Sequence, residues 1–325
     1  MKRFILKVVA FATIQFVILA ILWSGWRNEG HYLRAVKLKE SLAHDMPGPR
    51  VLFVGGSNVA FGIRSEFLEN EFHLPVINLG LHAGFGKDFI LNQAEAAVKP
   101  GDIVVLMLEY EHYHSNIPSL DLLTMSCIDP AELRHFSPRD WAYLGDRGLS
   151  FIAALANAGV NGWSTPHSAS PVAMDIKSFN ARADFVHDGT SKFHSTANDH
   201  PPLAFPKLDE IIDQLNQLND VCMAKGAKLF LGYPPMPHAV IANGDDRLTQ
   251  LDQTLREKLH FDVLWRPTDL AQDDSSFFDT RYHLTTAGAE ENSRRILESM
   301  RGRVPSEGFD RLSRIAIENT SGHVR

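Results

Sequence analysis

The sequence predicts an α/β protein in which a five-stranded, parallel, doubly wound sheet lies between two layers of helices. Five short apolar runs are each bounded by turn residues, which is typical of strands buried on both faces. Amphipathic patterns of helical length separate the runs, and an alternation of strand and helix is typical of a parallel sheet. The five runs are Val51–Gly55, Val76–Gly80, Ile103–Leu108, Lys228–Gly232 and Phe261–Trp265.

An apolar stretch precedes the first of these strands. The chain opens with Lys2 and Arg3, and residues 4–23 are almost wholly apolar. About 20 apolar residues span a bilayer as a helix, and the closing LWSGWRN is a poor match to the A-x-A-like pattern of a signal-peptide cleavage site. We therefore expect residues 1–26 to form an uncleaved transmembrane anchor rather than a cleaved signal. The basic residues at its start favour a cytoplasmic N-terminus, with the rest of the chain in the periplasm.

Helical patterns come next. Residues 27–48 have such a pattern, which PGPR ends, and we expect them to form a stalk. An α/β domain then occupies residues 49–301. One of its helical patterns begins at Pro206, which suits a first helical turn, and ends at Gly226, a favourable residue after a helix C-terminus. The helical patterns of the domain cover residues 87–98, 206–227, 245–259 and 285–300.

Residues 115–206 interrupt this alternation after the third strand. Short helical pieces are followed there by a segment rich in Ser, Pro, His and Asp, and we expect this insertion to cap or shape a site. Residues 302–325 then form a tail with one short amphipathic helix. A disulfide between Cys127 and Cys222 requires an exported domain, and the helical pattern around Cys222 favours a small core residue instead.

The charge of the chain is mildly acidic. Its 325 residues include 39 acidic and 32 basic side chains, a formal net charge of −7. The acidic residues are dispersed and no basic block stands out, so nothing in the composition indicates a nucleic-acid partner.

The residues that follow the strands carry the chemistry. In an open parallel sheet, ligands bind beyond the carboxyl ends of the strands. Ser57 follows two glycines after the first strand, NLGLHAGFG follows the second, and FFDTRYHLTTAG, with Asp279 and His283, follows the fifth. A serine becomes a nucleophile when a histidine takes its proton, a carboxylate orients the imidazole, and N–H groups beside glycines can face an oxyanion. These are the parts of an acyl-transfer site.

Together the three segments resemble, in order and strand context, the sequence blocks of the SGNH/GDSL hydrolase superfamily. GGSN stands for the first block, NLGLHAG for the second and FDTRYHLTTAG for the last, so that the resemblance covers the α/β domain without its insertion. It implies a flavodoxin-like three-layer fold with Ser57 as nucleophile, His283 as base and Asp279 as the partner of the base. The oxyanion hole would use the N–H groups of Ser57 and of Gly84 or Ala83. Neither a cofactor nor a metal is implied.

Two residues in the first and third blocks depart from the family's pattern. Gly56 stands where the family has an aspartate, and the strand that should lead to an oxyanion-donating asparagine ends in LEYEHY. Losing one such donor costs about 3 kcal/mol of transition-state stabilisation. Tyr110 or His112 is a candidate substitute, whereas Glu109 and Glu111 cannot donate while ionised.

The spacing of the last block differs as well. Asp279 and His283 lie four positions apart, whereas the family's pair lies three apart, so Asp273 or Asp274 is an alternative partner for the histidine. The candidate substrate contacts at the strand ends are Asn58, His82, Glu109, Tyr110 and His112.

These features predict a membrane-anchored, periplasmic serine esterase or O-acyltransferase that works through an acyl-enzyme. Membrane-tethered members of the resembled superfamily include polysaccharide O-acetyltransferase components. The resemblance therefore implies acyl esters, above all acetyl esters, of a cell-surface polysaccharide, and a membrane acyltransferase as a partner. Hydrolysis and transfer differ in whether water or a sugar hydroxyl attacks the acyl-enzyme. Two alternatives stay open: a catalytically silent protein that binds or helps assemble an envelope glycan, and a cytosolic lipase-like enzyme.

Overall fold

The computed structural model describes most of the chain between residues 31 and 303. No helix among the described residues is long and apolar enough to cross a membrane. The expected anchor, residues 1–26, and the expected tail, residues 302–325, fall largely outside the described part of the chain. The described residues are isolated positions between 3 and 17 and the ranges 31–115, 118–160, 175–187, 189–202 and 204–303.

A parallel sheet forms the centre of the domain. It consists of β1 (Val51–Gly55), β2 (Val76–Asn78), β3 (Ile103–Met107) and β4 (Lys228–Leu231). The strand order is β2-β1-β3-β4, and every pairing is parallel. All residues of the inner strands β1 and β3 are buried, which explains why their sequences are apolar without alternation. The predicted α/β class with a parallel sheet is confirmed.

The fifth predicted strand, Phe261–Trp265, is not a strand in the described chain. It makes a single parallel bridge, between Leu231 and Val263. The guanidinium group of Arg256 donates hydrogen bonds to the carbonyl oxygens of Val263, at 3.0 Å, and of Trp265, at 3.1 Å. The bridge consists of two backbone hydrogen bonds, from the N–H of Leu231 to the carbonyl oxygen of Asp262 at 3.0 Å and from the N–H of Leu264 to the carbonyl oxygen of Leu231 at 2.8 Å. The carbonyls that Arg256 binds alternate with these positions, so they face away from β4 and Arg256 covers the outer edge of the segment. The described sheet therefore has four strands rather than five.

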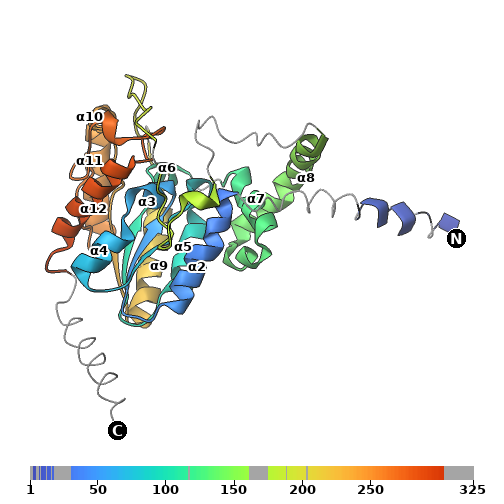
Figure 1. Ribbon diagram of the computed structural model, residues 1–325, viewed down its shortest axis with the longest axis horizontal. Coiled ribbons are helices and arrows are strands. Elements are labelled where there is room, and N and C mark those ends of the chain that lie inside the picture. The colour runs from blue at the N-terminus through green and yellow to red at the C-terminus, as the bar shows by residue number, and fades with distance from the viewer. Residues whose placement is uncertain are drawn as a thin grey trace, which may run out of the picture.

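Helices cover both faces of the sheet (Figure 1). On one face α2, α5 and α9 lie side by side, and on the other α3, α4 and α12 pack together. The helices of the insertion, α7 and α8, extend beyond α2 and α5 (Figure 1). These helices are α2 (Ala35–Asp45), α3 (Ser57–Gly62), α4 (Ser65–Phe72), α5 (Lys87–Ala97), α7 (Leu120–Ile128), α8 (Pro138–Val160), α9 (Leu208–Ala224) and α12 (Thr286–Met300).

Shorter elements join them. The other α-helices of the described chain are α6 (Glu111–His114), α10 (His238–Ala242) and α11 (Asp245–Lys258). All four helical patterns that the sequence predicts for the domain form helices: α5, α9, α11 and α12. The 3-10 helices are η1 (Tyr32–Arg34), η2 (Ala83–Phe85), η3 (Pro130–His135), η4 (Ile176–Ser178) and η5 (Asp274–Ser276).

Helix α2 lies where the sequence predicts a stalk, yet it is packed as part of the domain. Ala43 contributes to the main core and Val36 to a second apolar cluster. Buried Lys39 donates hydrogen bonds to the carbonyl oxygen of Asn78 at 3.0 Å and to that of Ala183 at 2.6 Å. Because burial is costly for an ammonium group without partners, these contacts hold α2 against β2 and the insertion.

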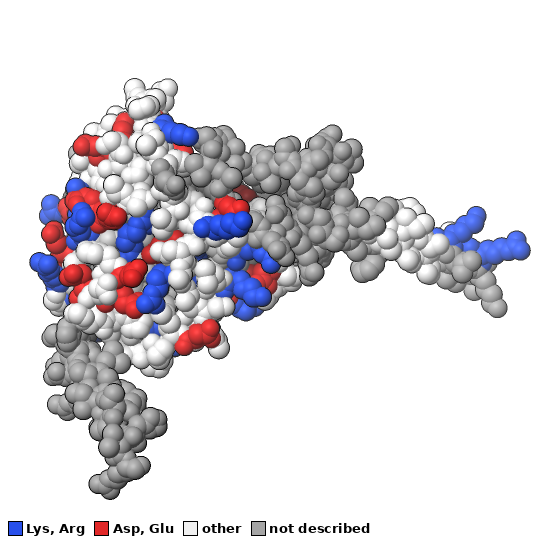
Figure 2. Space-filling model, viewed as in Figure 1, with Lys and Arg blue, Asp and Glu red and all other residues white. Residues whose placement is uncertain are grey.

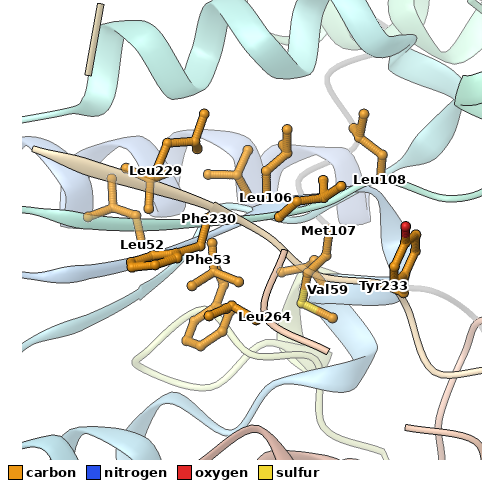
Figure 3. Close-up of a cluster of buried hydrophobic side chains, with 14 of the residues drawn as sticks. Leu52, Phe53, Val59, Leu106, Met107, Leu108, Leu229, Phe230, Tyr233 and Leu264 are labelled. Carbon is orange, nitrogen blue, oxygen red and sulfur yellow. The ribbon is translucent and has the colours of Figure 1, made fainter. Parts of the chain in front are cut away.

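The main core lies on both sides of the sheet. Figure 3 shows Leu106 and Leu229 pointing to one side, and Phe53 and Met107 pointing to the other. All four side chains are at most 8% exposed. Each apolar side chain of this size contributes about 1.5–3 kcal/mol when it is fully buried, so the packing holds the strands, and hence their carboxyl ends, in a fixed arrangement.

The second part of the insertion packs against the strand ends. The backbone N–H of Phe185 donates to the carbonyl oxygen of Ala60 in α3, at 3.1 Å. The buried carboxylate of Asp184 accepts hydrogen bonds from the backbone N–H and the hydroxyl of Ser65, both at 2.7 Å. The insertion is therefore anchored on α3 and α4, and α3 is the helix that begins with Ser57.

The charged side chains on the surface are mixed in sign. In Figure 2 basic and acidic side chains are intermixed over the visible face of the body, and neither sign forms a continuous block there.

Cys127 and Cys222 are both free thiols. Burial raises the pKa of each thiol to about 11, so that neither is a reactive thiolate near neutral pH.

Candidate active site

Ser57 lies at the junction of β1 and α3, as its first helical residue. Two close approaches require the glycines that precede it. A Cβ atom on Gly55 would lie 2.4 Å from the carbonyl oxygen of Met107 in β3, and one on Gly56 would lie 2.9 Å from Oε1 of Glu109. The chain therefore turns sharply out of the sheet. Ser57 is left 9% exposed at the carboxyl edge of the strands.

His283 and Asp279 form a pair. The distance between Nδ1 of His283 and Oδ1 of Asp279 is 2.8 Å, and both side chains are largely buried. A tight loop makes the four-residue spacing work. The backbone N–H of Phe278 donates to the carbonyl oxygen of His283 at 2.7 Å, and the hydroxyl of Thr280 accepts from the backbone N–H of His283 at 3.2 Å. The carboxylate is thereby turned back toward the ring.

This pairing decides the tautomer of the imidazole. An ionised carboxylate only accepts hydrogen bonds, so the proton lies on Nδ1 and Nε2 is able to accept another. The alternative partner Asp274 is used elsewhere, because its carboxylate accepts from the backbone N–H of Ser195 at 2.7 Å and from its hydroxyl at 2.8 Å. Of the three carboxylates considered, Asp279, Asp273 and Asp274, it is Asp279 that contacts the histidine.

Phe61 connects the histidine to the helix that begins with Ser57, although the Ser57 hydroxyl itself bonds Glu109 and not the imidazole. It lies one helical turn after Ser57 in α3, so the two side chains share a face of that helix. Its ring stacks on the His283 ring, with centroids 4.1 Å apart and planes 8° apart. Phe61 also stacks on Phe185 of the insertion, with ring centroids 4.1 Å apart. The imidazole is therefore packed against α3 through a run of stacked rings.

The hydroxyl group of Ser57 contacts a carboxyl group in this structure. Its Oγ donates to Oε1 of Glu109 at 3.0 Å, and the backbone N–H of Asn58 donates to the same oxygen at 3.2 Å. Burial, reinforced by the nearby charge of Glu111, raises the pKa of Glu109 to about 7, although His283 and the two hydrogen bonds act in the opposite direction. Near neutral pH this side chain is therefore partly in its neutral, protonated form.

The second block lies beside the first, but the backbone N–H of Gly84, one of the expected oxyanion donors, already makes a hydrogen bond. Ala83 is close to Gly56, because a Cβ on that glycine would lie 3.0 Å from both the Cα and the Cβ of Ala83. The backbone N–H of Gly84, however, donates to Nδ1 of His82 at 2.9 Å. That N–H can face an oxyanion only after His82 moves. His82 is partly exposed and lies 3.9 Å from the carboxylate of Asp121.

Two of the candidate substrate contacts are buried inside the protein. Asn58 is fully buried, where its amide accepts from the N–H of Gly56 at 3.1 Å and donates to the carbonyl oxygen of Met107 at 2.9 Å. Tyr110 is also fully buried, and its hydroxyl has no hydrogen-bond partner among the described residues. Asn58 therefore fastens the turn at Ser57 to β3, and neither residue meets a substrate.

His112 packs against the second block. Its Nε2 lies 3.0 Å from the carbonyl oxygen of Ala83, and it is only 5% exposed. Burial lowers the pKa of His112, so its ring stays neutral near pH 7 and holds η2 rather than supplying a positive charge.

Two further residues of the last block, Arg281 and Tyr282, make contacts that the family motif does not indicate. The hydroxyl of Tyr282 accepts from the backbone N–H of Tyr110 at 3.2 Å and donates to Glu111 at 2.7 Å, while Arg281 forms an ion pair with Glu111. These contacts attach the last block to the residues that follow β3. Both residues stand between Asp279 and His283 in the sequence, which is the signal that could have drawn attention to them.

One other group of side chains has the composition of a metal site. Ligand atoms of Glu40, Glu132 and His135 lie within 4.8 Å of one another, and Nε2 of His135 is 2.9 Å from Oε1 of Glu40. The guanidinium group of Arg134 contacts Glu40 and lies 3.0 Å from Nε2 of His135. An arginine therefore already supplies the positive charge at this position.

No protein-family model matches the chain, and no curated protein matches it. The geometry of the strand ends and the block resemblance are therefore the grounds on which a function is proposed.

Proposed function

We propose that the chain is a serine esterase or O-acyltransferase of the SGNH type. Ser57 is its nucleophile, His283 its general base and Asp279 the carboxylate that orients the base. The observation that carries the proposal is the stacking of Phe61 on His283 at 4.1 Å, since it brings a histidine already paired with a carboxylate over the helix that begins with Ser57. A serine, an imidazole and a carboxylate perform nucleophilic acyl transfer on unrelated folds.

The reaction follows from these contacts. The Ser57 hydroxyl turns from Glu109 toward Nε2 of His283, which takes its proton as Oγ bonds to the ester carbon. The carbonyl oxygen becomes an oxyanion beside the backbone N–H of Ser57 and the η2 segment. As the tetrahedral adduct collapses, the ester C–O bond breaks and the imidazolium returns its proton to the leaving alcohol. Water or a sugar hydroxyl then releases the acyl group from Ser57 by the same steps in reverse.

The substrate and the location belong to the same proposal. We infer acyl, above all acetyl, esters of a cell-surface polysaccharide, a membrane acyltransferase as the acyl-donor partner, and a periplasmic domain held by residues 1–26. These inferences are supported by the apolar run at the start of the chain and by the block resemblance.

A direct test uses the full chain, purified in detergent, and a fluorophosphonate probe that labels activated serines. We expect labelling, and release of acetate from an aryl acetate, in the parent protein. Ser57→Ala should abolish both, and His283→Ala should lower both at least about a thousandfold. Ser299→Ala is the matched control, because the hydroxyl of Ser299 bonds only within its own helix, to the carbonyl oxygen of Arg295 at 2.9 Å. Equal labelling of the parent and of Ser57→Ala would refute the assignment.

A second candidate function is a silent glycan-binding protein on the same fold. Two observations favour it: the hydroxyl of Ser57 is bonded to Glu109, and the N–H of Gly84 is bonded to His82. It predicts that a cell whose only copy carries Ser57→Ala has the surface-glycan acylation of the parent. Loss of that acylation, with the variant protein present at normal abundance, would favour the enzyme instead.

A further inference from the structure

We propose that Glu109, as a neutral carboxylic acid, is the oxyanion donor that replaces the asparagine missing from the third block. The inference depends on the proposed serine mechanism and names a catalytic residue of that same site. It also predicts how the reaction depends on pH. The sequence alone excludes a glutamate from this role, because a carboxylate cannot donate; the surroundings of the side chain remove that objection.

The position of the carboxyl group is suitable. Glu109 follows β3, at the strand end where the resembled family has its asparagine, and its Oε1 lies 3.0 Å from the nucleophilic oxygen of Ser57. The oxyanion forms on an atom bonded to the carbon that Ser57 attacks, so it develops within reach of a group this close. Oxyanion donors act at hydrogen-bond distance from the place where that charge appears.

The contacts also indicate which oxygen carries the proton. Oε1 accepts two hydrogen bonds, from the Ser57 hydroxyl and from the N–H of Asn58 at 3.2 Å. Among the described residues no hydrogen bond engages Oε2. In a neutral carboxyl group the carbonyl oxygen accepts and the hydroxyl donates. Oε1 is therefore the carbonyl oxygen, and Oε2 carries the proton that can be donated to an oxyanion.

The groups around Glu109 favour its neutral form. The side chain is only 6% exposed, and Glu111 on the following helix adds a like charge that is only partly balanced by Arg281 and Tyr282. His283 and the two donated hydrogen bonds favour the ionised form, but they leave the pKa of Glu109 at about 7. Below that pH the residue is a donor. Above it, a carboxylate faces the developing oxyanion and the two like charges repel.

The two departures from the family's pattern then explain each other. A Cβ atom on Gly56 would lie 2.9 Å from Oε1 of Glu109, so the aspartate that the family has there would displace this carboxyl group from its position. Gly56 makes room for Glu109, and Glu109 takes over the lost function of the third block.

The test compares the rate of fluorophosphonate labelling across pH for the full chain and three variants. In the parent the rate should fall about tenfold per pH unit above pH 7, as the neutral fraction of Glu109 falls. Glu109→Gln keeps a permanent donor, so it should label at a rate similar to the parent at pH 6 and retain that rate at pH 9. Glu109→Ala should be about 100-fold slower at pH 6.

Glu111→Gln is the matched control, since it alters a neighbouring carboxylate without removing the donor. It should move the alkaline fall to lower pH, because the charge of Glu111 raises the pKa of Glu109. A parent rate with no fall above pH 7 would overturn the proposal. So would loss of labelling in Glu109→Gln at every pH, since that result would make Glu109 the base.

An infrared measurement supplies a readout that needs no turnover. The difference spectrum between the parent and Glu109→Gln should contain the C=O stretch of a protonated carboxyl group at pH 6, and this band should disappear by pH 9. Absence of the band at pH 6 would overturn the proposal. If the band is present but the parent does not label at any pH, the serine mechanism itself fails and the donor role with it. Circular dichroism verifies that each variant is folded.

Discussion

Asp279 accepts a hydrogen bond from Nδ1 of His283 at 2.8 Å, and this contact determines which ring nitrogen can act as a base. In Asp279→Asn the amide can donate to Nδ1 and so favour the tautomer with its proton on Nε2, which cannot accept the serine proton. We expect the rate of fluorophosphonate labelling to fall by about 10²–10⁴-fold with little change in stability. The labelling rate is measured on aliquots that are quenched at successive times, and it checks the expected fall.

Asp274→Asn is the control for that experiment, because Asp274 bonds Ser195 and not the histidine. Its labelling rate should match that of the parent. The reverse pattern, with a slow Asp274→Asn and a normal Asp279→Asn, would mean that the other carboxylate orients the base.

Gly56→Ala tests the close approach at the nucleophile. The new Cβ would lie 2.9 Å from Oε1 of Glu109 and 3.0 Å from Ala83, closer than ordinary van der Waals contact. We expect the free energy of unfolding to fall by about 1–3 kcal/mol. In a Glu109→Ala background the same substitution should cost less, because one of the two clashes has been removed. Denaturant unfolding of the four proteins gives this coupling, and strictly additive costs would contradict the packing described.

The sequence indicates candidate residues for this site but not the contacts that they make. Ser57, Asp279 and His283 follow from short blocks, because each block fixes a strand end or a loop locally. The contact between Ser57 and Glu109 joins positions 52 residues apart, and the pKa of Glu109 depends on burial that no short pattern records. The sequence also predicts Asn58 as a substrate contact, because an amide side chain suits binding. The structure buries this side chain, where it bonds Gly56 and Met107, and a short pattern does not record that burial.

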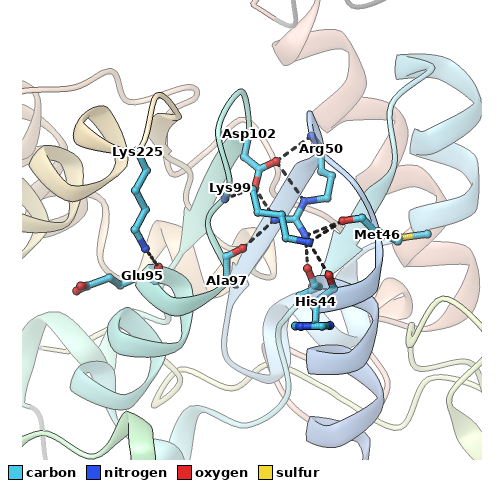
Figure 4. A network of polar contacts seen from close by, with 9 residues as sticks. His44, Met46, Arg50, Glu95, Ala97, Lys99, Asp102 and Lys225 are labelled. Carbon is cyan, nitrogen blue, oxygen red and sulfur yellow. Dashed lines mark hydrogen bonds and ion pairs between the residues drawn. The ribbon is translucent and has the colours of Figure 1, made fainter. Parts of the chain in front are cut away.

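At the scale of elements, a buried ion pair fastens the end of the sheet opposite the site. Arg50 precedes β1 and Asp102 precedes β3, and their side chains meet with Nη2 of Arg50 2.5 Å from Oδ2 of Asp102 (Figure 4). The guanidinium group also donates to the carbonyl oxygen of Ala97 at 2.8 Å, and the backbone N–H of Lys99 donates to Oδ2 at 2.8 Å. One pair therefore joins β1, β3 and the end of α5.

Asp102→Asn should destabilise the fold without touching the chemistry. Removing one charge leaves the buried guanidinium of Arg50 uncompensated, which costs about 3–5 kcal/mol. Guanidinium unfolding should show this loss, while labelling of the folded fraction stays at the parent rate. Lys225→Met is the control from the same view in Figure 4, because Lys225 bonds the carbonyl oxygen of Glu95 at the surface. It should cost under about 1 kcal/mol. An Asp102→Asn protein as stable as the parent would contradict the role of the pair.

The elements that the sequence predicts correctly are those whose signal is local. Helices α5, α9, α11 and α12 combine an apolar face with clear ends, and β1 and β3 are short apolar runs between turns. The run at Phe261–Trp265 has the same local appearance. It makes a single bridge with β4, and how far such a pairing extends depends on long-range contacts that leave no periodic trace in a sequence.

At the scale of the whole molecule, the insertion joins the site rather than only covering it. Asp184 reaches Ser65 across 119 residues of sequence, and the guanidinium of Arg64 donates to the carbonyl oxygen of Phe185 at 3.0 Å. The sequence predicts an insertion that caps or shapes a site; these contacts attach it to Arg64 and Ser65, and its role at the site stays a prediction. Which of its residues would do so depends on long-range packing that becomes visible only in three dimensions.

Phe185 is the residue through which the insertion contacts the support of His283, the proposed base. It is 1% exposed, stacks on Phe61, and shares a small apolar cluster with Ala60 and Phe278. Phe61 in turn stacks on His283 at 4.1 Å. In Phe185→Ala the lost ring leaves a cavity beneath Phe61, so the free energy of unfolding should fall by about 3–5 kcal/mol.

The same substitution should slow the chemistry, because Phe61 can settle into the cavity and carry the imidazole away from Ser57. We expect labelling of the folded protein to fall at least about tenfold, since small displacements of a positioned group are costly to catalysis. Phe185→Leu, which fills most of the volume, should restore both stability and rate in large part. Val186→Ala is the neighbouring control, as that side chain is 39% exposed and should change stability by less than about 0.5 kcal/mol. If Phe185→Ala loses stability but labels at the parent rate, the insertion stabilises the domain without positioning His283.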